Sequence, residues 1–154
     1  MASPVDASAA AVYRRFIEAV NRQDLDTATR LIDVHRYREN CVGFTRGFVG
    51  WEDAKTSIRK VWQGLPNLTV ELQHVASNGD VALAQGTVRG TATGRLYGAP
   101  ATKRSFEANF FDFVRVADGL IVERIQQADI LSQMLQLYGR TIGLVGLGTM
   151  FLKQ

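Results

Sequence analysis

The sequence predicts an α+β fold, in which N-terminal helices pack in the concave face of one curved antiparallel sheet to form an α+β barrel. Two observations carry this prediction. Apolar residues recur at helical spacing before residue 64, and from residue 68 onward they alternate with polar residues as in strands. Helices followed by mostly antiparallel strands are typical of α+β domains. The length of 154 residues fits one domain over 1–154, with an apolar, glycine-rich tail at 140–154.

Three helices are expected before the sheet. In the first, Val12, Phe16 and Ile17 form one apolar stripe, and Asp6 or Ser8 can cap its start. A mixed stretch precedes the third helix, and it is expected to hold a short strand or an irregular connection. The expected helices cover 7–22, 25–32 and 51–63, and the mixed stretch covers 35–48.

Four long strands are expected after the helices, joined by hairpins. The Ser-Asn-Gly-Asp run at 77–80 and the Ala-Asp-Gly run at 117–119 are rich in residues that favour tight turns. A closing helix or turn over 129–138 ends at Gly139. The expected strands cover 68–77, 81–93, 104–116 and 120–128.

Composition limits the classes of function. The formal charge is +3, and the basic residues are spread along the chain without the stripe that is typical of nucleic-acid binding. No run approaches the roughly 18 apolar residues that span a bilayer, and the first residues lack the pattern of a signal peptide. The single cysteine, Cys41, indicates a reducing compartment. We therefore expect a cytoplasmic protein that binds neither nucleic acid nor membranes, and the spacing of its histidines and carboxylates predicts no metal site.

Several short motifs, taken in order, resemble the SnoaL-like family of polyketide cyclases. The resemblance covers about residues 10–139. It implies a nuclear-transport-factor-like (cystatin-like) barrel that binds a hydrophobic small molecule, pairs as a homodimer and works without a cofactor. The motifs are RFIEAVN at 15–21, LPNL at 65–68, GDVA at 79–82, DGLIVE at 118–123 and LYG at 137–139.

The resemblance points to Gln126 and Asp112 as the catalytic residues. The cyclases carry the acid/base of their aldol step at the position of Gln126, and a histidine at the position of Asp112. An amide does not accept a proton near pH 7, so Gln126 is expected to orient a carbonyl or an enolate. Asp112 shares a face with Phe110 and other apolar residues, which would make it a general base unless an arginine pairs with it.

The register of the second hairpin decides whether these side chains meet. A two-residue turn would pair Ala117 with Leu120 and would place Asp112 on the face of Ile125. A three-residue turn with a bulge at Gly119 would place Asp112 opposite Arg124. We favour the three-residue turn, and we expect Asp112 to lie in the pocket within hydrogen-bond reach of Arg124 or Gln126.

Further candidates are expected to bind the substrate. Tyr37, Asn40 and the neighbouring Glu39 lie in the stretch that resembles the family's pocket edge. Asp129 is either a second pocket acid or a helix cap, and His74 lies on an apolar face, where histidines are more often structural. The expected substrate-binding residues are Tyr37, Asn40, His74, Phe110, Arg124 and Asp129.

Three functions remain open at this point. The leading one is a tailoring enzyme of aromatic, anthracycline-like polyketide biosynthesis that carries out a cyclase or hydroxylase reaction on a polycyclic ketone. The second is an epoxide hydrolase or isomerase that uses Asp112, Arg124 and Asp129. The third is a binding module without catalysis, which would have a pocket without a buried carboxylate.

The homodimer is expected to form through the outer sheet face, where Thr87, Arg89, Glu107 and Asn109 are placed by alternation.

Overall fold

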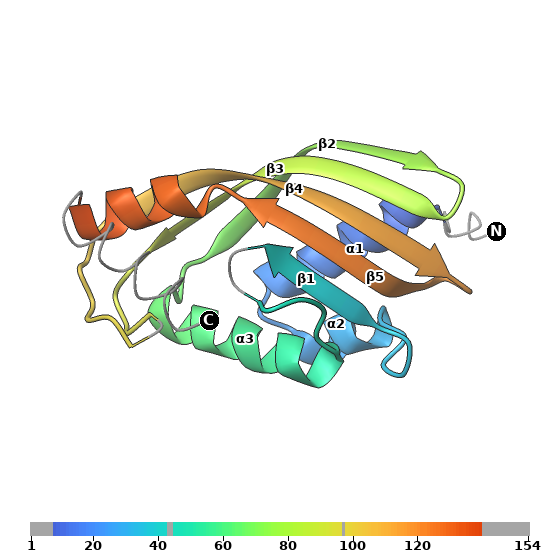
Figure 1. Cartoon of the computed structure of the whole chain (residues 1–154), viewed down its shortest axis with the longest axis horizontal. Helices are drawn as coiled ribbons and strands as arrows, with labels where there is room; N and C mark the ends of the chain where they lie inside the picture. The colour runs from blue at the N-terminus through green and yellow to red at the C-terminus, as the bar shows by residue number, and fades with distance from the viewer. Residues whose placement is uncertain (1–7, 43–44, 97, 140–154) are drawn as a thin grey trace.

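The computed structural model describes residues 8–42, 45–96 and 98–139, so the expected tail at 140–154 lies outside the described residues. Helices and strands follow the predicted order (Figure 1). The helices are α1 (Ala9–Asn21), α2 (Leu25–Arg30) and α3 (Trp51–Gly64), and residues 130–139 are also helical. The strands are β1 (Arg38–Val42), β2 (Thr69–Asn78), β3 (Val81–Thr91), β4 (Ser105–Ala117) and β5 (Leu120–Ala128).

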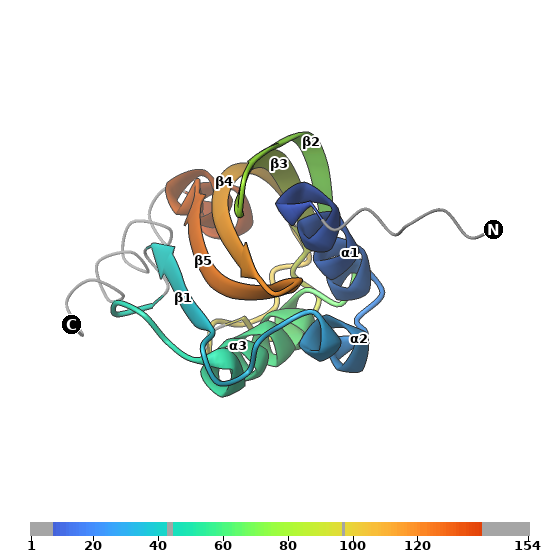
Figure 2. The ribbon, with the colours of Figure 1, turned by 90° about the vertical axis from the view of Figure 1, so that its right-hand side faces the viewer.

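The strands form one curved sheet in the order β1-β5-β4-β3-β2. The four long strands pair antiparallel as predicted, and the short strand β1 is added parallel to β5 at one edge. The sheet curls around the helices but does not close on itself (Figure 2). The predicted α+β class is therefore confirmed, with helices filling the open side of the curl.

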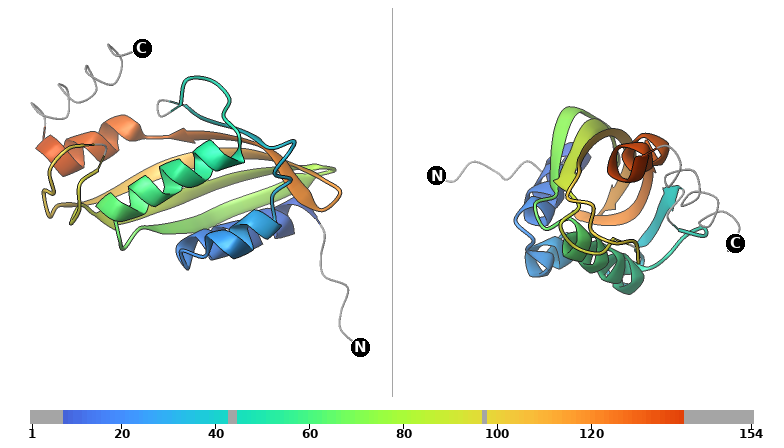
Figure 3. Two further views of the ribbon diagram at one scale, coloured as in Figure 1. Left: turned by 90° about the horizontal axis from the view of Figure 1, so that it is seen from below. Right: turned by 90° about the vertical axis from the view of Figure 1, so that its left-hand side faces the viewer.

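Helices α1 and α3 lie against the concave face of the sheet (Figure 3). Ser8 caps α1, because its hydroxyl accepts a hydrogen bond from the Ala11 backbone N–H at 3.2 Å. The apolar stripe of α1 is buried as predicted, and Phe16 packs edge-on against Trp51 at the start of α3. No helix in the described part of the chain has the length and apolar character to cross a membrane.

The hairpin between β4 and β5 differs from both predicted registers. Its turn has two residues, Asp118 and Gly119, and both have positive φ (53° and 77°), as in a type I′ turn. The extra residue is Val122, which forms a bulge further along β5. Beyond the bulge Asp112 pairs with Gln126, so the favoured three-residue turn is wrong although the expected proximity is right.

A second bulge corrects the placement of His74. The register of β2 against β3 shifts between Leu72 and His74, which leaves Gln73 as the extra residue. A one-residue shift moves every later side chain to the other face. Val75 therefore packs against the core, whereas His74 is exposed on the outer face and does not line a cavity.

Gly86 in β3 allows Phe110 of β4 to lie across the concave face. A Cβ atom at Gly86 would lie 2.7 Å from the Phe110 ring, closer than packed atoms approach, and closer still to the Glu71 carbonyl oxygen. The absence of a side chain thus lets the aromatic ring take this position.

We expect Gly86→Ala to destabilise the fold, because the added methyl group must displace either the Phe110 ring or the backbone of β2. Overpacking of this kind costs about 1–3 kcal/mol. Equilibrium unfolding in urea measures the change. Gln85→Ala, which alters the half-buried neighbour on the same strand, is the control and should change stability by less than about 0.5 kcal/mol. Equal stability of the two variants would contradict the packing argument.

We propose that the outer sheet face forms a homodimer. Its exposed apolar residues include Leu83 and Phe111, which are 58% and 61% exposed. Light scattering at micromolar concentration should give twice the 17.0 kDa of one chain. Phe111→Asp should give a monomer, because it places a charge within the apolar patch. A wild-type mass of one chain would contradict the proposal.

Candidate active site

A cavity of about 190 Å³ lies between the helices and the concave face of the sheet. Its walls are mainly apolar and come from α1, α3 and the long strands, as is typical of small-molecule sites. Four polar side chains lie together in its lining on β1 and β5. They are Glu39, Cys41, Arg124 and Gln126.

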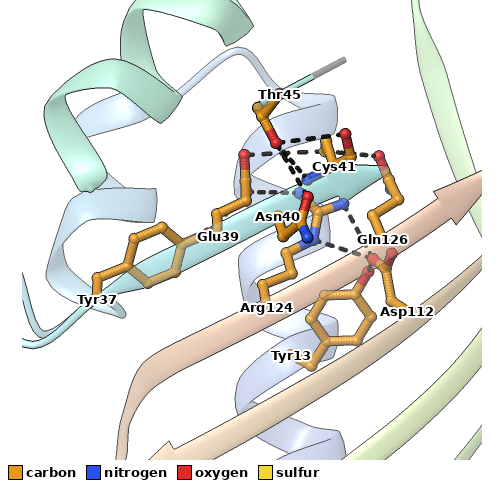
Figure 4. Close-up of polar contacts among 9 residues, drawn as sticks. All are labelled: Tyr13, Tyr37, Glu39, Asn40, Cys41, Thr45, Asp112, Arg124 and Gln126. Atoms are coloured by element: carbon orange, nitrogen blue, oxygen red, sulfur yellow. Dashed lines mark hydrogen bonds and ion pairs between the residues drawn. The ribbon is translucent and has the colours of Figure 1, made fainter. Parts of the chain in front are cut away.

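Arg124 is the centre of this polar group (Figure 4). Its Nε and Nη2 atoms both donate to Asp112 Oδ2 at 3.0 Å, and its Nη1 atom donates to Glu39 Oε2 at 3.0 Å. One guanidinium therefore joins carboxylates from the edge strand β1 and from β4. Two carboxylates around one guanidinium carry a net negative charge when both are ionised, which is costly to bury unless hydrogen bonds compensate.

Asp112 lies behind Arg124 rather than in the cavity lining. It is 2% exposed, and its Oδ2 atom also accepts a hydrogen bond from the Tyr13 hydroxyl on α1. Its Oδ1 atom has no hydrogen-bond partner among the described residues. The expected reach to Arg124 is confirmed, and this tight pairing argues against Asp112 as the base that contacts a substrate.

Glu39 is the carboxylate that faces the cavity. It is 5% exposed and accepts hydrogen bonds at Oε2 from Arg124 and, at 2.8 Å, from the Tyr37 hydroxyl. Tyr37 packs edge-on against Trp51, which fixes its ring behind Glu39. Both donors act on one carboxylate oxygen, and among the described residues Oε1 has only a 3.9 Å contact with the Cys41 sulfur.

The two tyrosines around the network stay neutral donors. Burial raises the pKa of Tyr13 well above its ordinary value, and the negative charge of Asp112 adds to this effect. The pKa of Tyr37 is raised for the same reasons, by burial first and then by Glu39. Burial alone would lower the pKa of Arg124, but the surrounding negative groups, Asp112 foremost, raise it well above its ordinary value.

Cys41 and Gln126 complete the polar lining. The two residues are paired across β1 and β5, and the Cys41 thiol lies 3.3 Å from Gln126 Oε1, which accepts its hydrogen bond. With that oxygen occupied, the Gln126 amide nitrogen has no protein partner in the part of the chain that the structure describes. Gln126 can therefore donate a hydrogen bond to a ligand oxygen, as predicted for an orienting residue.

The other predicted residues divide between the cavity and its surroundings. Phe110 lines the cavity, and Tyr37 lies behind Glu39 without lining it. Asn40 does not line it either, since alternation along β1 turns it away from Glu39 and Cys41 to contact Thr45. Asp129 is exposed and accepts a hydrogen bond from the Ser132 backbone N–H, so it caps the helical segment 130–139 and is not a pocket acid.

Two cavity-lining residues were missing from the expected substrate-binding residues: Glu39 was named only as a neighbour at the pocket edge, and Gln133 was not named. Glu39 sits in a short strand whose partner β5 is about 80 residues away, and local sequence patterns do not report such parallel pairing. Gln133 carries a readable signal, because it occupies an inward position of the helical segment 130–139 between Ile130 and Leu137.

Comparison with known families gives one clear match. The family model described as SnoaL-like polyketide cyclase matches residues 10–137. No curated protein matches this chain significantly.

Solved structures resemble this chain at low sequence identity, which shows the fold alone. IdmH, a candidate polyketide cyclase from Streptomyces antibioticus, is 24% identical, with a TM-score of 0.75 over 83% of this chain and 96% of that one. AclR, a candidate hydroxylase from Streptomyces galilaeus, is 19% identical, with a TM-score of 0.72 over 92% and 96%. An LEH-like epoxide hydrolase from M. tuberculosis is 17% identical, with a TM-score of 0.67 over 95% and 96%.

Cys41 should make the fold sensitive to alkali. Burial raises its pKa from an ordinary value of 9.0 to about 12, so the folded state keeps a proton that the unfolded state releases. The resulting stabilisation is complete below pH 9 and is lost as the pH rises towards 12. In urea unfolding at pH 8 and pH 10.5, Cys41→Ala should lose less stability between the two values than the wild type, by about 2 kcal/mol. If the wild type and Cys41→Ala lost equal stability between the two pH values, the pKa of the Cys41 thiol would not be raised by burial.

Proposed function

Because this chain belongs to the SnoaL-like polyketide cyclase family, we propose that it catalyses acid–base chemistry on a polyketide-type ketone with its own side chains. The observation that carries the proposal is the Glu39 carboxylate, which faces an apolar cavity beside the Arg124 guanidinium. A carboxylate in a largely dry cavity can remove a proton, and an adjacent cation can stabilise the charge that develops. A pocket for binding alone would not require a buried carboxylate in its wall.

The proposed first step is proton abstraction from the carbon beside the substrate carbonyl. Glu39 Oε1 accepts the proton, the C–H bond breaks, and its electron pair moves to the carbonyl oxygen as an enolate. The Gln126 amide nitrogen and the N–H groups of Arg124 not bound to Asp112 or Glu39 are the donors that stabilise this oxygen. Gln126 thus orients the enolate, as expected for an amide where the cyclases carry an acid.

Ring closure completes the proposed reaction. The enolate carbon adds to a second carbonyl of the same substrate, and protonated Glu39 returns its proton to the new alkoxide. Asp112 acts here as a positioning residue, since it holds Arg124 through two hydrogen bonds to Oδ2. A hydroxylase reaction would begin with the same enolate, so the two versions share the step assigned to Glu39.

Epoxide opening is the second candidate, and one observation favours it. Arg124 lies between two carboxylates, the arrangement required to activate water and protonate the leaving oxygen. Glu39, and not Asp129 as expected, is the second carboxylate beside Arg124. However, Glu39 alone of the two carboxylates lines the cavity, which favours a single acid–base group and hence the enolate reaction.

The expectation of a cytoplasmic enzyme stays a prediction based on the single cysteine.

The proposal predicts that the protein exchanges the α-hydrogens of an aryl ketone for deuterium. The probe is 4-acetylbiphenyl in D₂O, with exchange of its methyl hydrogens followed by mass spectrometry. Glu39→Gln keeps the acceptor for Arg124 and Tyr37 but removes the base, so exchange should fall by about 10²-fold or more. Asp112→Asn should have a smaller effect, because Asp112 does not line the cavity and acts through its contact with Arg124.

Glu123→Gln is the matched control. Glu123 is also a buried glutamate on the sheet, but it pairs with Arg38 and Arg115 outside the cavity. The exchange rate of Glu123→Gln should equal that of the wild type.

A larger loss of exchange for Asp112→Asn than for Glu39→Gln would show that Asp112, not Glu39, is the base. Hydration of styrene oxide to its diol without ketone exchange would favour the epoxide hydrolase.

A further inference from the structure

Gln133 is a polar residue on the side of its helical segment that otherwise carries apolar residues. The helical segment 130–139 turns Ile130, Met134 and Leu137 towards the core at helical spacing, and Gln133 lies within the same inward stripe. Gln133 is 7% exposed and lines the cavity. Its side-chain amide has no hydrogen-bond partner within the described part of the chain, whereas its backbone N–H donates to the Asp129 carbonyl oxygen.

This amide lies at the end of the cavity opposite to the charged network. The cavity follows β5 from Arg124 past Gln126 to Ala128, a span of about 13 Å at roughly 3.3 Å per residue. The helical segment 130–139 continues beyond the end of β5 (Figure 1), so Gln133 lies past Ala128. The rest of the lining is mainly apolar and includes Val88 and Phe106.

The Gln133 amide atoms are not among the fully enclosed polar atoms that lack a partner in the described part of the chain, which is consistent with an amide that faces the cavity. A ligand that fills the cavity must form a hydrogen bond with this amide, or it leaves the amide without water. The amide offers both a donor and an acceptor, and a phenolic hydroxyl group can use both. We infer that Gln133 binds a hydroxyl oxygen at the far end of an elongated aromatic substrate. The substrate class is therefore an aryl ketone whose carbonyl lies at the Glu39–Arg124 end and whose phenol lies about 10 Å or more away, as the length of β5 between the ends requires.

The orientation of the ketone in this inference rests on the proposed function, whereas the hydroxyl contact does not. The two fail separately, because the hydroxyl contact is measured by binding and the proposed function by deuterium exchange.

The test compares two ligands that differ only in the distal hydroxyl, 4-acetylbiphenyl and 4-acetyl-4′-hydroxybiphenyl. Binding is measured by calorimetry with the full chain. The wild type should bind the hydroxylated ketone about five-fold more tightly, the effect of one net hydrogen bond. Gln133→Leu should bind both ligands equally, and Gln133→Met, which keeps the unbranched shape, should do the same if the leucine variant does not fold.

The control is Gln127→Leu, the same substitution on the exposed side of β5, which should keep the five-fold preference. A second readout separates ligand binding from a structural role. Loss of an unpartnered amide should raise the Tm of free Gln133→Leu, whereas loss of a structural contact would lower it. A preference for the hydroxyl that survives in both Gln133 variants, a wild type without preference, or a lowered Tm in both variants would each overturn the inference.

Discussion

The architecture of this protein depends on one buried guanidinium. Arg124 holds a carboxylate from β1 on one side and a carboxylate from β4 on the other, and Tyr13 ties the second carboxylate to α1. A planar fork of donors fixes the angle between its partners, which a lysine could not do. Removing one member of such a group leaves uncompensated charge in the interior, at a cost of about 3–5 kcal/mol. The same contacts that set the edge strand in place therefore also build the polar wall of the cavity.

The fold was predictable because its signals are local. The apolar stripe of α1, the alternation of the long strands and the glycine-containing turns each predict an element from neighbouring residues alone, and all of them occur close to the expected bounds. The bulges at Gln73 and Val122 were not predictable, because neither residue differs from an ordinary strand residue. Bulges depend on how two strands fit together, and each one reversed a face assignment.

The site was predictable only in part, for the same reason. Asp112, Arg124 and Gln126 come from one hairpin. The predicted turn was one residue too long, but the bulge at Val122 adds one residue to β5, so the three side chains still lie close together. Glu39 is brought to them by a parallel pairing that spans most of the chain, and its importance appears only when β1 is seen beside β5. Sequence reasoning assigned the catalytic role to Asp112 and named Glu39 only as a neighbour at the pocket edge. The sequence left open whether Asp129 is a pocket acid or a helix cap, and the structure shows that it caps the helical segment 130–139.

The placement of Gln133 on a separate helical segment has a consequence for how such a protein can diversify. The charged network is distributed over α1, β1, β4 and β5, and its members constrain one another, so changes there are coupled. The segment 130–139 contributes Met134 and Leu137 to an apolar cluster with Leu65, Leu96 and Phe106. It shares none of the hydrogen bonds of the charged network. Substitutions on its inward face can alter which molecule is accepted while the reacting groups stay untouched. A lineage built on this scaffold can thus exchange substrates in small, independent steps without rebuilding its chemistry.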